Sequence, residues 1–369
     1  MLPLTRRACL TLAAAAPLMA AAEAAPSLAE TAAGRGLLYG SDSDSEIARE
    51  PPAYAQLIRR QCALFAPMFQ WRLTAPRADG PDPAWTDPNI AFARQAGLHL
   101  TGGHFIWHES VPDWFASTDG RGGAERAMVR HIDQLGRAYA GWVYAWNVVN
   151  EALDPRARRA DGLRQTVFTT RFGGDAFFDV AFHAARAADP TAILAYNEYG
   201  LETASPAHAA RRAALLALLD RILARGVPID AVGLQSHLRL DGAAFDDSAY
   251  RRFLREIAAR GLRILITELD VLDRDRRRDI AQRDAEVADM YARFLAVALD
   301  EKAVASVVTW GLSDRYTWLS PEISPELDLP PGPPARPLPF DAGFRPKPAH
   351  TAMIDAFAAA PARDPAHMR

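Results

Sequence analysis

The sequence predicts an α/β fold, a single-domain (β/α)8 TIM barrel, and three observations favour this fold class. The chain has 369 residues, 49% of them apolar and 24% charged, which is ordinary globular composition for one or two domains. Short apolar runs alternate with longer amphipathic segments from residue 36 onward. The first β-to-α turn has no Gly-x-Gly-x-x-Gly pattern, which argues against the competing doubly wound open sheet.

Eight runs have the character of strands that are covered on both faces, because several of them are apolar without a clean polar alternation. These runs are residues 36–40, 62–67, 98–107, 142–150, 192–197, 229–236, 262–268 and 305–310. Each run is followed by enough chain for a helix or a loop, so we expect eight parallel strands that close into a barrel.

The longer segments between these runs are predicted to be helices on the outside of the barrel. They include residues 125–139, 206–226, 250–261 and 279–300. Gly226 and Gly261 stand where a glycine commonly ends a helix. The proline-rich stretch 321–339 lies between the eighth strand and the last helix, so it is predicted to be a surface loop at the catalytic rim of the barrel.

Residues 1–25 are predicted to be an export signal, and residues 26–369 the folded catalytic domain. Arg6 and Arg7 precede an apolar run over residues 10–22 that ends in small residues. This run is shorter than the about 20 residues of a membrane span. The arginine pair favours a twin-arginine signal, with a general secretory signal as the alternative. We therefore expect a soluble protein that is periplasmic or secreted.

Charge and cysteine content exclude several kinds of partner. Lys and Arg total 42 against 45 Asp and Glu, which gives a formal charge of −3 and no basic field for nucleic acid or an anionic membrane. The two cysteines, Cys9 and Cys62, exclude a disulfide framework and a cysteine-based zinc site. We expect a monomer without a cofactor.

Polar and aromatic side chains stand at the predicted carboxyl ends of six consecutive strands, where barrel enzymes keep their reactive groups. Glu151 ends the fourth strand and Glu268 the seventh, so the two carboxyl groups are expected to face each other. Glycoside hydrolysis needs one protonated and one ionised carboxyl group. Indole faces suit pyranose rings, and amides and histidines bond hydroxyls. Such residues at these ends are His104, Trp107, His108, Asn150, Asn197, Gln235, His237 and Trp310.

A metal-dependent hydrolase is a weaker alternative, which would use His104, His108 and His237. The spacing of the first two histidines serves one face of a helix, but here it falls on a predicted strand. We therefore expect no metal ion at this site.

With these motifs in this order, the chain resembles family 10 glycoside hydrolases, whose typical member is an endo-β-1,4-xylanase. The resemblance covers nearly the whole mature chain. It rests on residues 146–151 (WNVVNE), 196–197 (YN), 235–237 (QSH), 266–270 (ITELD), Trp310-Gly311 with Asp314 and Trp318, 340–341 (FD) and 345–349 (RPKPA).

The resemblance implies a β-linked polysaccharide or oligosaccharide substrate, namely xylan or xylo-oligosaccharides cleaved at β-1,4-xylosidic bonds. It implies a retaining double displacement with Glu151 as general acid/base and Glu268 as nucleophile. It also implies that Asn150 bonds the 2-hydroxyl of the −1 sugar and that His237 contacts the nucleophile. In the same resemblance Asp270 orients His237, and Gln235 lies close to this pair. The walls of the −1 subsite are formed by Trp107, Trp310 and Trp318. We expect the ionised form of Glu268 to be favoured by its donors, and the pKa of Glu151 to be raised by apolar surroundings and the charge of Glu268.

One segment departs from the family pattern. The second strand of the family ends in an Asn-Glu-Met-Lys-Trp run that grips the −2 sugar, whereas residues 67–71 here read Pro-Met-Phe-Gln-Trp. Two alternatives follow, namely a retaining β-glycosidase with an altered substrate and a carbohydrate-binding or sensing protein on the same scaffold. The presence of both glutamates, Asn150 and the His237–Asp270 pair favours an enzyme.

Overall fold

The fold is described from a computed structural model that covers residues 26–43, 46–78, 88–273, 275, 277–321, 323–327, 329 and 332–364. The export signal predicted for residues 1–25 lies outside these described residues.

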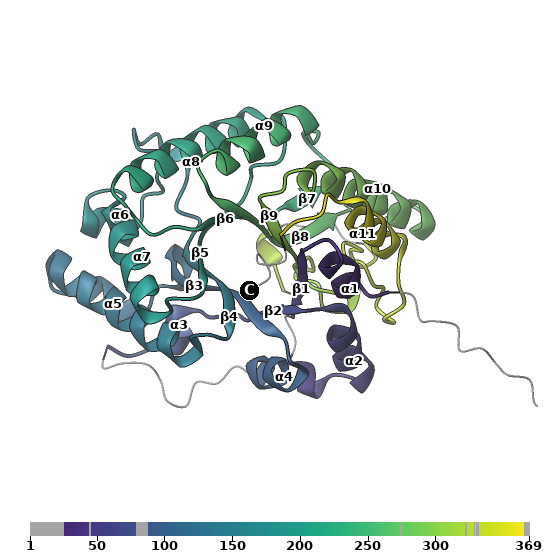
Figure 1. Ribbon diagram of the computed structural model, residues 1–369, viewed down its shortest axis with the longest axis horizontal. Coiled ribbons are helices and arrows are strands. Elements are labelled where there is room, and N and C mark those ends of the chain that lie inside the picture. Colours follow the sequence, from purple (N-terminus) through teal and green to yellow (C-terminus); the bar gives the residue numbers. More distant parts are fainter. Residues whose placement is uncertain are drawn as a thin grey trace, which may run out of the picture.

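Eight parallel strands form a closed ring, which confirms the predicted barrel (Figure 1). They are β1 (Leu38–Asp42), β2 (Leu64–Ala66), β3 (His99–Trp107), β4 (Val143–Asn150), β5 (Ile193–Glu198), β6 (Ala231–Leu234), β8 (Arg263–Leu272) and β9 (Val304–Thr309). The strands pair in the order β6-β5-β4-β3-β2-β1-β9-β8, and a pairing between β6 and β8 closes the ring. Every predicted run overlaps one of these strands. A short additional strand, β7 (His237–Arg239), pairs with the end of β8.

Helices surround this ring (Figure 1). The α-helices are α1 (Leu28–Ala33), α2 (Pro52–Gln61), α3 (Trp71–Thr74), α4 (Pro88–Ala96), α5 (Gly120–Tyr139), α6 (Val167–Phe172), α7 (Ala176–Ala188), α8 (Pro206–Ala224), α9 (Asp247–Ala258), α10 (Ile280–Ala298) and α11 (Pro348–Ala359). Short 3-10 helices are η1 (Ile47–Arg49), η2 (His108–Ser110), η3 (Asp113–Ser117), η4 (Pro155–Ala157), η5 (Asp314–Tyr316) and η6 (Pro325–Leu327).

The helix boundaries follow from local sequence chemistry. The hydroxyl of Ser205 accepts a hydrogen bond from the backbone N–H of His208 at 3.2 Å and caps the start of α8. Gly226 and Gly261 follow α8 and α9 with φ angles of 74° and 77°, the left-handed conformation in which glycine ends a helix without steric cost. All four predicted helical segments are helices, and α5 begins at Gly120, five residues before the predicted start.

The barrel interior is filled by apolar side chains from the strands. One core cluster consists of strand residues alone, and it includes Ala145 in β4 and Ala195 in β5. Two residues further along these strands, Asn147 and Asn197 continue the inward-facing rows with amide groups. The larger cluster lies between the strands and the helices. The inward rows therefore change from apolar to polar toward the carboxyl ends of the strands.

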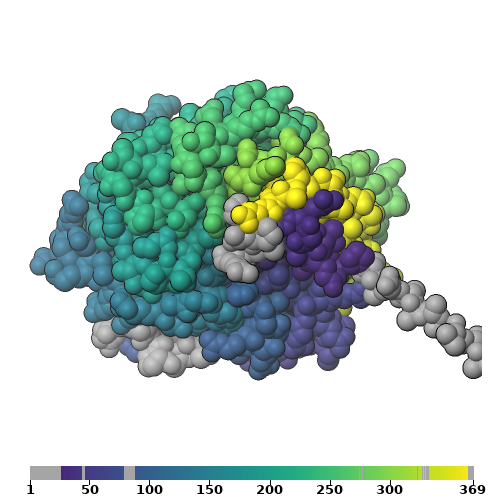
Figure 2. Space-filling view, in the orientation of Figure 1, coloured from purple at the N-terminus to yellow at the C-terminus, as the bar shows by residue number. Residues whose placement is uncertain are grey.

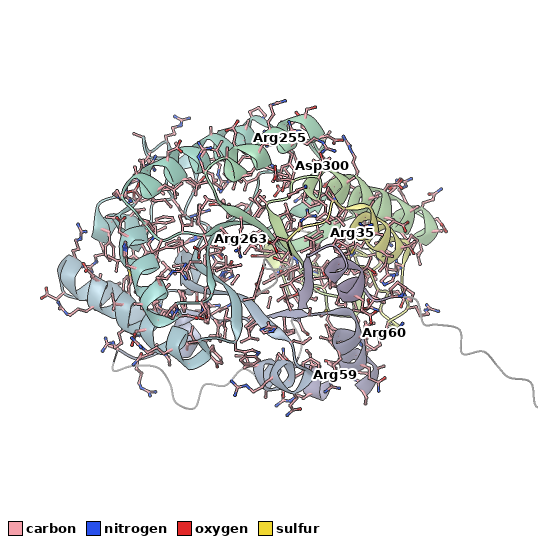
Figure 3. The ribbon with its side chains drawn as sticks, viewed as in Figure 1. Arg35, Arg59, Arg60, Arg255, Arg263 and Asp300 are labelled. Carbon is pink, nitrogen blue, oxygen red and sulfur yellow. The ribbon has the colours of Figure 1, made fainter. Side chains whose placement is uncertain are left out.

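The two ends of the described chain lie together at the opposite end of the barrel. Figure 2 shows α1 in purple beside α11 in yellow on this face. The guanidinium of Arg363 donates to the carbonyl oxygens of Leu299 and Val304, each at 2.7 Å. Charged groups otherwise spread over the outer helices, where Arg59 and Arg60 of α2 and Arg255 of α9 are labelled (Figure 3). No helix in the described part of the chain is long and apolar enough to span a membrane.

Candidate active site

A cleft of about 950 Å³ opens at the carboxyl ends of the barrel strands. Nine of the twelve residues predicted for the site line it, namely Glu151, Glu268, His237, Asn150, Gln235, His104, Trp107, Trp310 and Trp318. Asn197 and Asp270 lie directly behind the lining residues and bond to them. His108 instead lines a small enclosed cavity behind Glu151 and Asn150. Topology thus brings together residues from six strand ends.

Glu151 follows the last residue of β4 and projects into the cleft from an unusual backbone conformation. Its φ angle is 55°, in the left-handed region that residues other than glycine seldom adopt. Its carboxyl group accepts hydrogen bonds from Trp107 Nε1 at 3.1 Å, Gln235 Nε2 at 2.9 Å and Asn150 Nδ2 at 3.2 Å. Strained backbone of this kind is concentrated at functional sites.

The environment of Glu151 favours its protonated form. Burial raises the pKa of Glu151, and the nearby charges of Glu198 and Glu268 raise it further, whereas the hydrogen bonds from Gln235 and Trp107 oppose the change. The resulting pKa is about 7. The predicted rise in the pKa of Glu151 is confirmed. The sequence argument missed the contribution of Glu198, which directly follows Asn197 in the chain.

Glu268 lies on β8, opposite Glu151, and accepts two hydrogen bonds. Asn197 Nδ2 donates to its Oε1 at 2.8 Å, and Nε2 of His237 lies 3.2 Å from its Oε2. The side chain of Glu268 is 8% exposed, and that exposed part faces the cleft. A carboxylate held by donors on both oxygens keeps one orientation toward a bound ligand.

His237 is held between two carboxylates. Its Nδ1 lies 3.1 Å from Oδ2 of Asp270, to which Trp318 Nε1 also donates at 2.7 Å. Burial alone would lower the pKa of His237, but Asp270 and Glu268 outweigh it and raise that pKa well above its usual value. His237 and Asp270 are paired neighbours in β7 and β8, so the short strand β7 sets this contact. A protonated His237 carries a proton on both ring nitrogens and can therefore donate to Asp270 and Glu268 at the same time.

Three amide side chains connect the two glutamates. Asn197 Nδ2 donates to Oδ1 of Asn150 at 3.0 Å as well as to Glu268, and Gln235 Nε2 lies 3.5 Å from the same oxygen. The hydroxyl of Thr267 donates to Oδ1 of Asn197 at 2.7 Å and fixes which end of this amide is the donor. Both carboxyl groups are therefore positioned by one hydrogen-bonded frame.

Strand irregularities allow this frame to form. Asn147 and Asn150 are three residues apart, so a regular strand would turn them to opposite faces. The register between β4 and β5 shifts between Asn147 and Val149, and both asparagines line the barrel interior or the cleft. A second shift in β3 occurs at Gly102 and Gly103, which have φ angles of 81° and 67°. Such bulges re-aim side chains beside active sites.

The two histidines of the third strand end have different surroundings. His104 is 7% exposed and borders both the cleft and a small polar cavity that it shares with Asn147. Burial lowers the pKa of His104 to about 4, so it is neutral near pH 7. Burial likewise lowers the pKa of His108 to about 4. Among the described residues no group of three or more His, Cys, Asp or Glu side chains is placed to hold a metal ion.

The segment that departs from the family pattern is mostly turned away from the cleft. Phe69 packs against Trp146 at a ring distance of 5.5 Å, and Trp71 stacks on His131 at 4.5 Å. Only Met68 of residues 67–71 lines the cleft. At this position the cleft wall is apolar and presents no charged side chain.

The proline-rich loop does lie at the rim, as predicted. Leu327 of this loop lines the cleft, and its described residues Leu329 and Ala335 pack with Leu319 and with Leu272 at the end of β8 as a separate small core.

The cleft wall built by the loop that follows β5 and by the end of β7 with the residues after it was missed by the sequence argument. It includes Tyr199, Glu202, Thr203, Arg239 and Asp241. The position of Tyr199, immediately after the fifth strand end, was the available signal. The other four residues carry no pattern that distinguishes them from ordinary surface loop.

Comparison with known proteins finds the family that the sequence motifs resemble. The family described as Glycosyl hydrolase family 10 matches residues 27–356. The chain is 34% identical over 298 residues to endo-1,4-beta-xylanase A of Cellvibrio japonicus, which covers 73% of this chain and 46% of that protein. It is 31% identical over 350 residues to endo-1,4-beta-xylanase 1 of Humicola insolens, which covers 93% of this chain and 77% of that protein. The chain thus spans about half the length of the Cellvibrio japonicus relative.

Solved structures resemble the whole barrel. Native xylanase 10B from Thermotoga maritima superposes with a TM-score of 0.79 at 25% identity and covers 90% of this chain and 98% of its own. A thermostable mutant of the xylanase Xyn10A from Cellvibrio japonicus superposes with a TM-score of 0.74 at 28% identity. It covers 88% of this chain and 98% of its own.

Proposed function

The chain belongs to glycosyl hydrolase family 10, and on that premise we propose that it is a retaining glycoside hydrolase that cleaves β-1,4-xylosidic bonds in xylan or xylo-oligosaccharides. The observation that carries this proposal is the pair Glu151 and Glu268 in one cleft, where burial favours the protonated form of Glu151 and donors hold both carboxyl oxygens of Glu268. The xylanase names of the relatives support the choice of substrate.

In the proposed first step, Glu151 donates its proton to the glycosidic oxygen while the carboxylate of Glu268 attacks the anomeric carbon. The bond to the leaving sugar breaks, and a covalent glycosyl–Glu268 ester forms. A pKa of about 7 keeps a large fraction of Glu151 protonated near neutral pH. Trp107 and Gln235 hold the carboxyl group that carries this proton.

In the second step, the deprotonated Glu151 takes a proton from a water molecule as that water attacks the anomeric carbon. The ester bond breaks, Glu268 returns as a carboxylate, and the anomeric configuration is retained after two inversions. Because Glu268 carries no charge while it is esterified, Glu151 loses one of the negative neighbours that raise its pKa. The ionised form of Glu151 is thereby favoured when a base is needed.

The other groups in the cleft support sugar binding in this proposal. Asn150 presents its amide beside both glutamates, where the 2-hydroxyl of the −1 sugar would lie. Trp107, Trp310 and Trp318 offer apolar faces to the ring, and His104 contributes a neutral imidazole. Asp270 and Asn197 act from behind by holding His237 and Glu268.

On the Arg6-Arg7 pair and the apolar run that follows it, we further propose that residues 1–25 direct export. We also propose that the mature protein is a monomer. Amino-terminal sequencing of protein recovered outside the cytoplasm should find a start near residue 26. Size-exclusion chromatography with light scattering should give the mass of one chain. An uncleaved product or a dimer would contradict the respective proposal.

The decisive test is proton NMR of the protein digesting β-1,4-xylan and xylohexaose, with the anomeric signals recorded from the first minutes. We expect newly formed β-anomer to precede mutarotation. Initial α-anomer would contradict retention. Hydrolysis of another β-glycan but not of xylan would indicate that Met68 and its neighbours have changed the substrate. Binding of oligosaccharides without any turnover would favour a carbohydrate-binding protein.

Two variants test the residue roles. Glu268→Ala is expected to lose hydrolysis by several orders of magnitude, and full activity of this variant would refute the mechanism. Glu109→Gln is the matched control, because Glu109 also lines the cleft but its side chain is 62% exposed and it contacts neither catalytic carboxyl group.

A further inference from the structure

We propose that Arg164 is a positioning residue for the general acid/base. It holds the main chain of Glu151 in its left-handed conformation and links that main chain to Tyr199, which lines the cleft. This inference rests on the proposed function, in which Glu151 protonates the leaving oxygen. No resemblance or sequence pattern singled out Arg164, which lies in the loop between η4 and α6.

The backbone of Glu151 needs external support. A φ angle of 55° in a non-glycine residue costs on the order of 1–3 kcal/mol and persists only when neighbouring groups hold it. Two contacts do so. The N–H of Glu151 donates to the carbonyl oxygen of Asn197 at 2.9 Å. Its carbonyl oxygen accepts from Nε of Arg164 at 3.2 Å. Arg164 is thus the side chain that holds the outgoing peptide of the acid/base residue.

The same guanidinium reaches three further groups. Its Nη2 donates to the carbonyl oxygen of Leu153 at 3.3 Å and to the hydroxyl of Tyr199 at 2.9 Å, and its Nη1 lies 3.8 Å from Asp154. The side chain is only 17% exposed, so these contacts are largely shielded from water. A rigid fork of donors that spans Glu151, Leu153 and Tyr199 is a task for which arginine is suited and lysine is not.

Arg164 acts on the position of Glu151 and not directly on its charge. The carboxyl group of Glu151 receives its hydrogen bonds from Trp107, Gln235 and Asn150, whereas Arg164 contacts the main-chain oxygen. Loss of Arg164 would therefore leave the donors of the carboxyl group in place while the direction of the side chain becomes less defined.

A second arginine keeps the loop folded when the first is removed. Nη1 of Arg211 donates to the carbonyl oxygen of Leu153 at 2.8 Å and to the buried Glu198 at 3.1 Å. Its guanidinium also lies 4.3 Å from the centre of the Tyr199 ring. Leu153 and Tyr199 therefore have a support that does not depend on Arg164, whereas the carbonyl oxygen of Glu151 has none among the hydrogen bonds described. The expected result of removing Arg164 is misplacement of the acid and not unfolding.

This reasoning predicts a loss of rate that depends on the leaving group. Departure of a sugar or an unsubstituted phenolate needs protonation, but departure of 2,4-dinitrophenolate does not, because that anion is stable without a proton. Misplacement of a catalytic group by about 1 Å costs on the order of 100-fold in rate. A merely structural role of Arg164 would reduce turnover of all substrates alike.

The experiment compares phenyl and 2,4-dinitrophenyl β-xylobioside as substrates of wild type and Arg164→Gln. We expect kcat/KM for the phenyl substrate to fall about 10- to 100-fold and that for the dinitrophenyl substrate to fall less than about 3-fold. Arg164→Lys keeps the charge but cannot span all the acceptors, so it should show the same pattern with smaller losses. Arg156→Gln is the matched control, since Arg156 lies in the preceding helix η4 with its side chain 77% exposed, and its guanidinium forms its hydrogen bond with Asp154 and none with the main chain of Glu151.

Equal losses for both substrates, or no loss for the phenyl substrate, would overturn the inference. If Arg164→Gln does not fold, the same comparison on Arg164→Lys decides. Glu151→Ala is measured in parallel to keep the two proposals apart. A Glu151→Ala enzyme that loses both activities equally would refute Glu151 as the acid. A selective loss in Glu151→Ala but not in the Arg164 variants would refute the role of Arg164 alone.

Discussion

Replacing Glu151 by glutamine is expected to make the protein more stable at and above neutral pH, although it removes the proposed catalytic acid. Burial, together with the charges of Glu198 and Glu268, raises the pKa of Glu151 from 4.5 to about 7 in the folded protein. Between these two values the unfolded chain has released a proton that the folded chain still holds. The free energy of unfolding of the wild type therefore falls as the pH rises through this window.

The size of the effect follows from that change of pKa. One pKa unit corresponds to about 1.4 kcal/mol, so the change from 4.5 to about 7 destabilises the wild type by about 3 kcal/mol once both states are ionised. Glutamine has a similar shape and does not titrate. The stability difference between Glu151→Gln and wild type should thus grow between pH 4.5 and pH 7 and stay constant above.

Urea denaturation followed by tryptophan fluorescence, repeated across this pH range, measures the difference directly. The altered hydrogen bonds to Trp107 and Gln235 change the free energy of unfolding by the same amount at every pH. The part of the stability difference that varies with pH therefore reports the ionisation of Glu151. Glu109→Gln serves as the control and should change the free energy of unfolding by less than about 0.5 kcal/mol at any pH. A difference that stays flat, or that favours the wild type as the pH rises, would refute the electrostatic reasoning.

Four further outcomes are expected. The value of kcat/KM for xylo-oligosaccharides should fall above about pH 7 as Glu151 loses its proton, and a profile that stays flat well above pH 7 would contradict its role as acid. Glu198→Ala leaves the guanidinium of Arg211 buried and unpaired, so urea denaturation should find a loss of about 3–5 kcal/mol. In Gly103→Ala the new Cβ would lie 2.3 Å from the ring of Phe69 at a φ angle of 67°, which should lower the thermal midpoint through a cost on the order of 1–3 kcal/mol. Exhaustive treatment with EDTA should leave hydrolysis unchanged, because the proposed steps use only carboxyl groups and water, and a chelator-sensitive rate would revive the metal-dependent alternative.

Much of the barrel was accessible from sequence because its strands are buried on both faces. Such strands appear as uninterrupted apolar runs, and all eight runs became strands of the ring. The additional strand β7 was not foreseen, since His237–Arg239 is too short and too polar to be recognised as a strand. Its pairing with β8 nevertheless places His237 against Asp270.

The catalytic pair was accessible for a related reason. Parallel barrel strands end on one face, so a glutamate directly after an apolar run must lie at that face. Glu151 and Glu268 could therefore be placed together from their positions in the chain. The same rule brought Asn150, Gln235, Trp107 and Trp310 to the cleft and Asn197 directly behind it. It could not separate His104, which borders the cleft, from His108, which lies behind Glu151.

The sequence by itself determined the order of strands and helices, the face on which the site lies, and the two carboxyl groups that we propose react. Only the tertiary structure decided the environment of each carboxyl group. Burial, the proximity of Glu198 and the frame around Asn150 arise from segments far apart in the chain, and the bulges of β3 and β4 set which side chains face inward. The support of Glu151 by Arg164 has the same origin. Electrostatic and hydrogen-bond energies depend on distances of a few ångström between such segments, and spacing along the chain does not encode those distances.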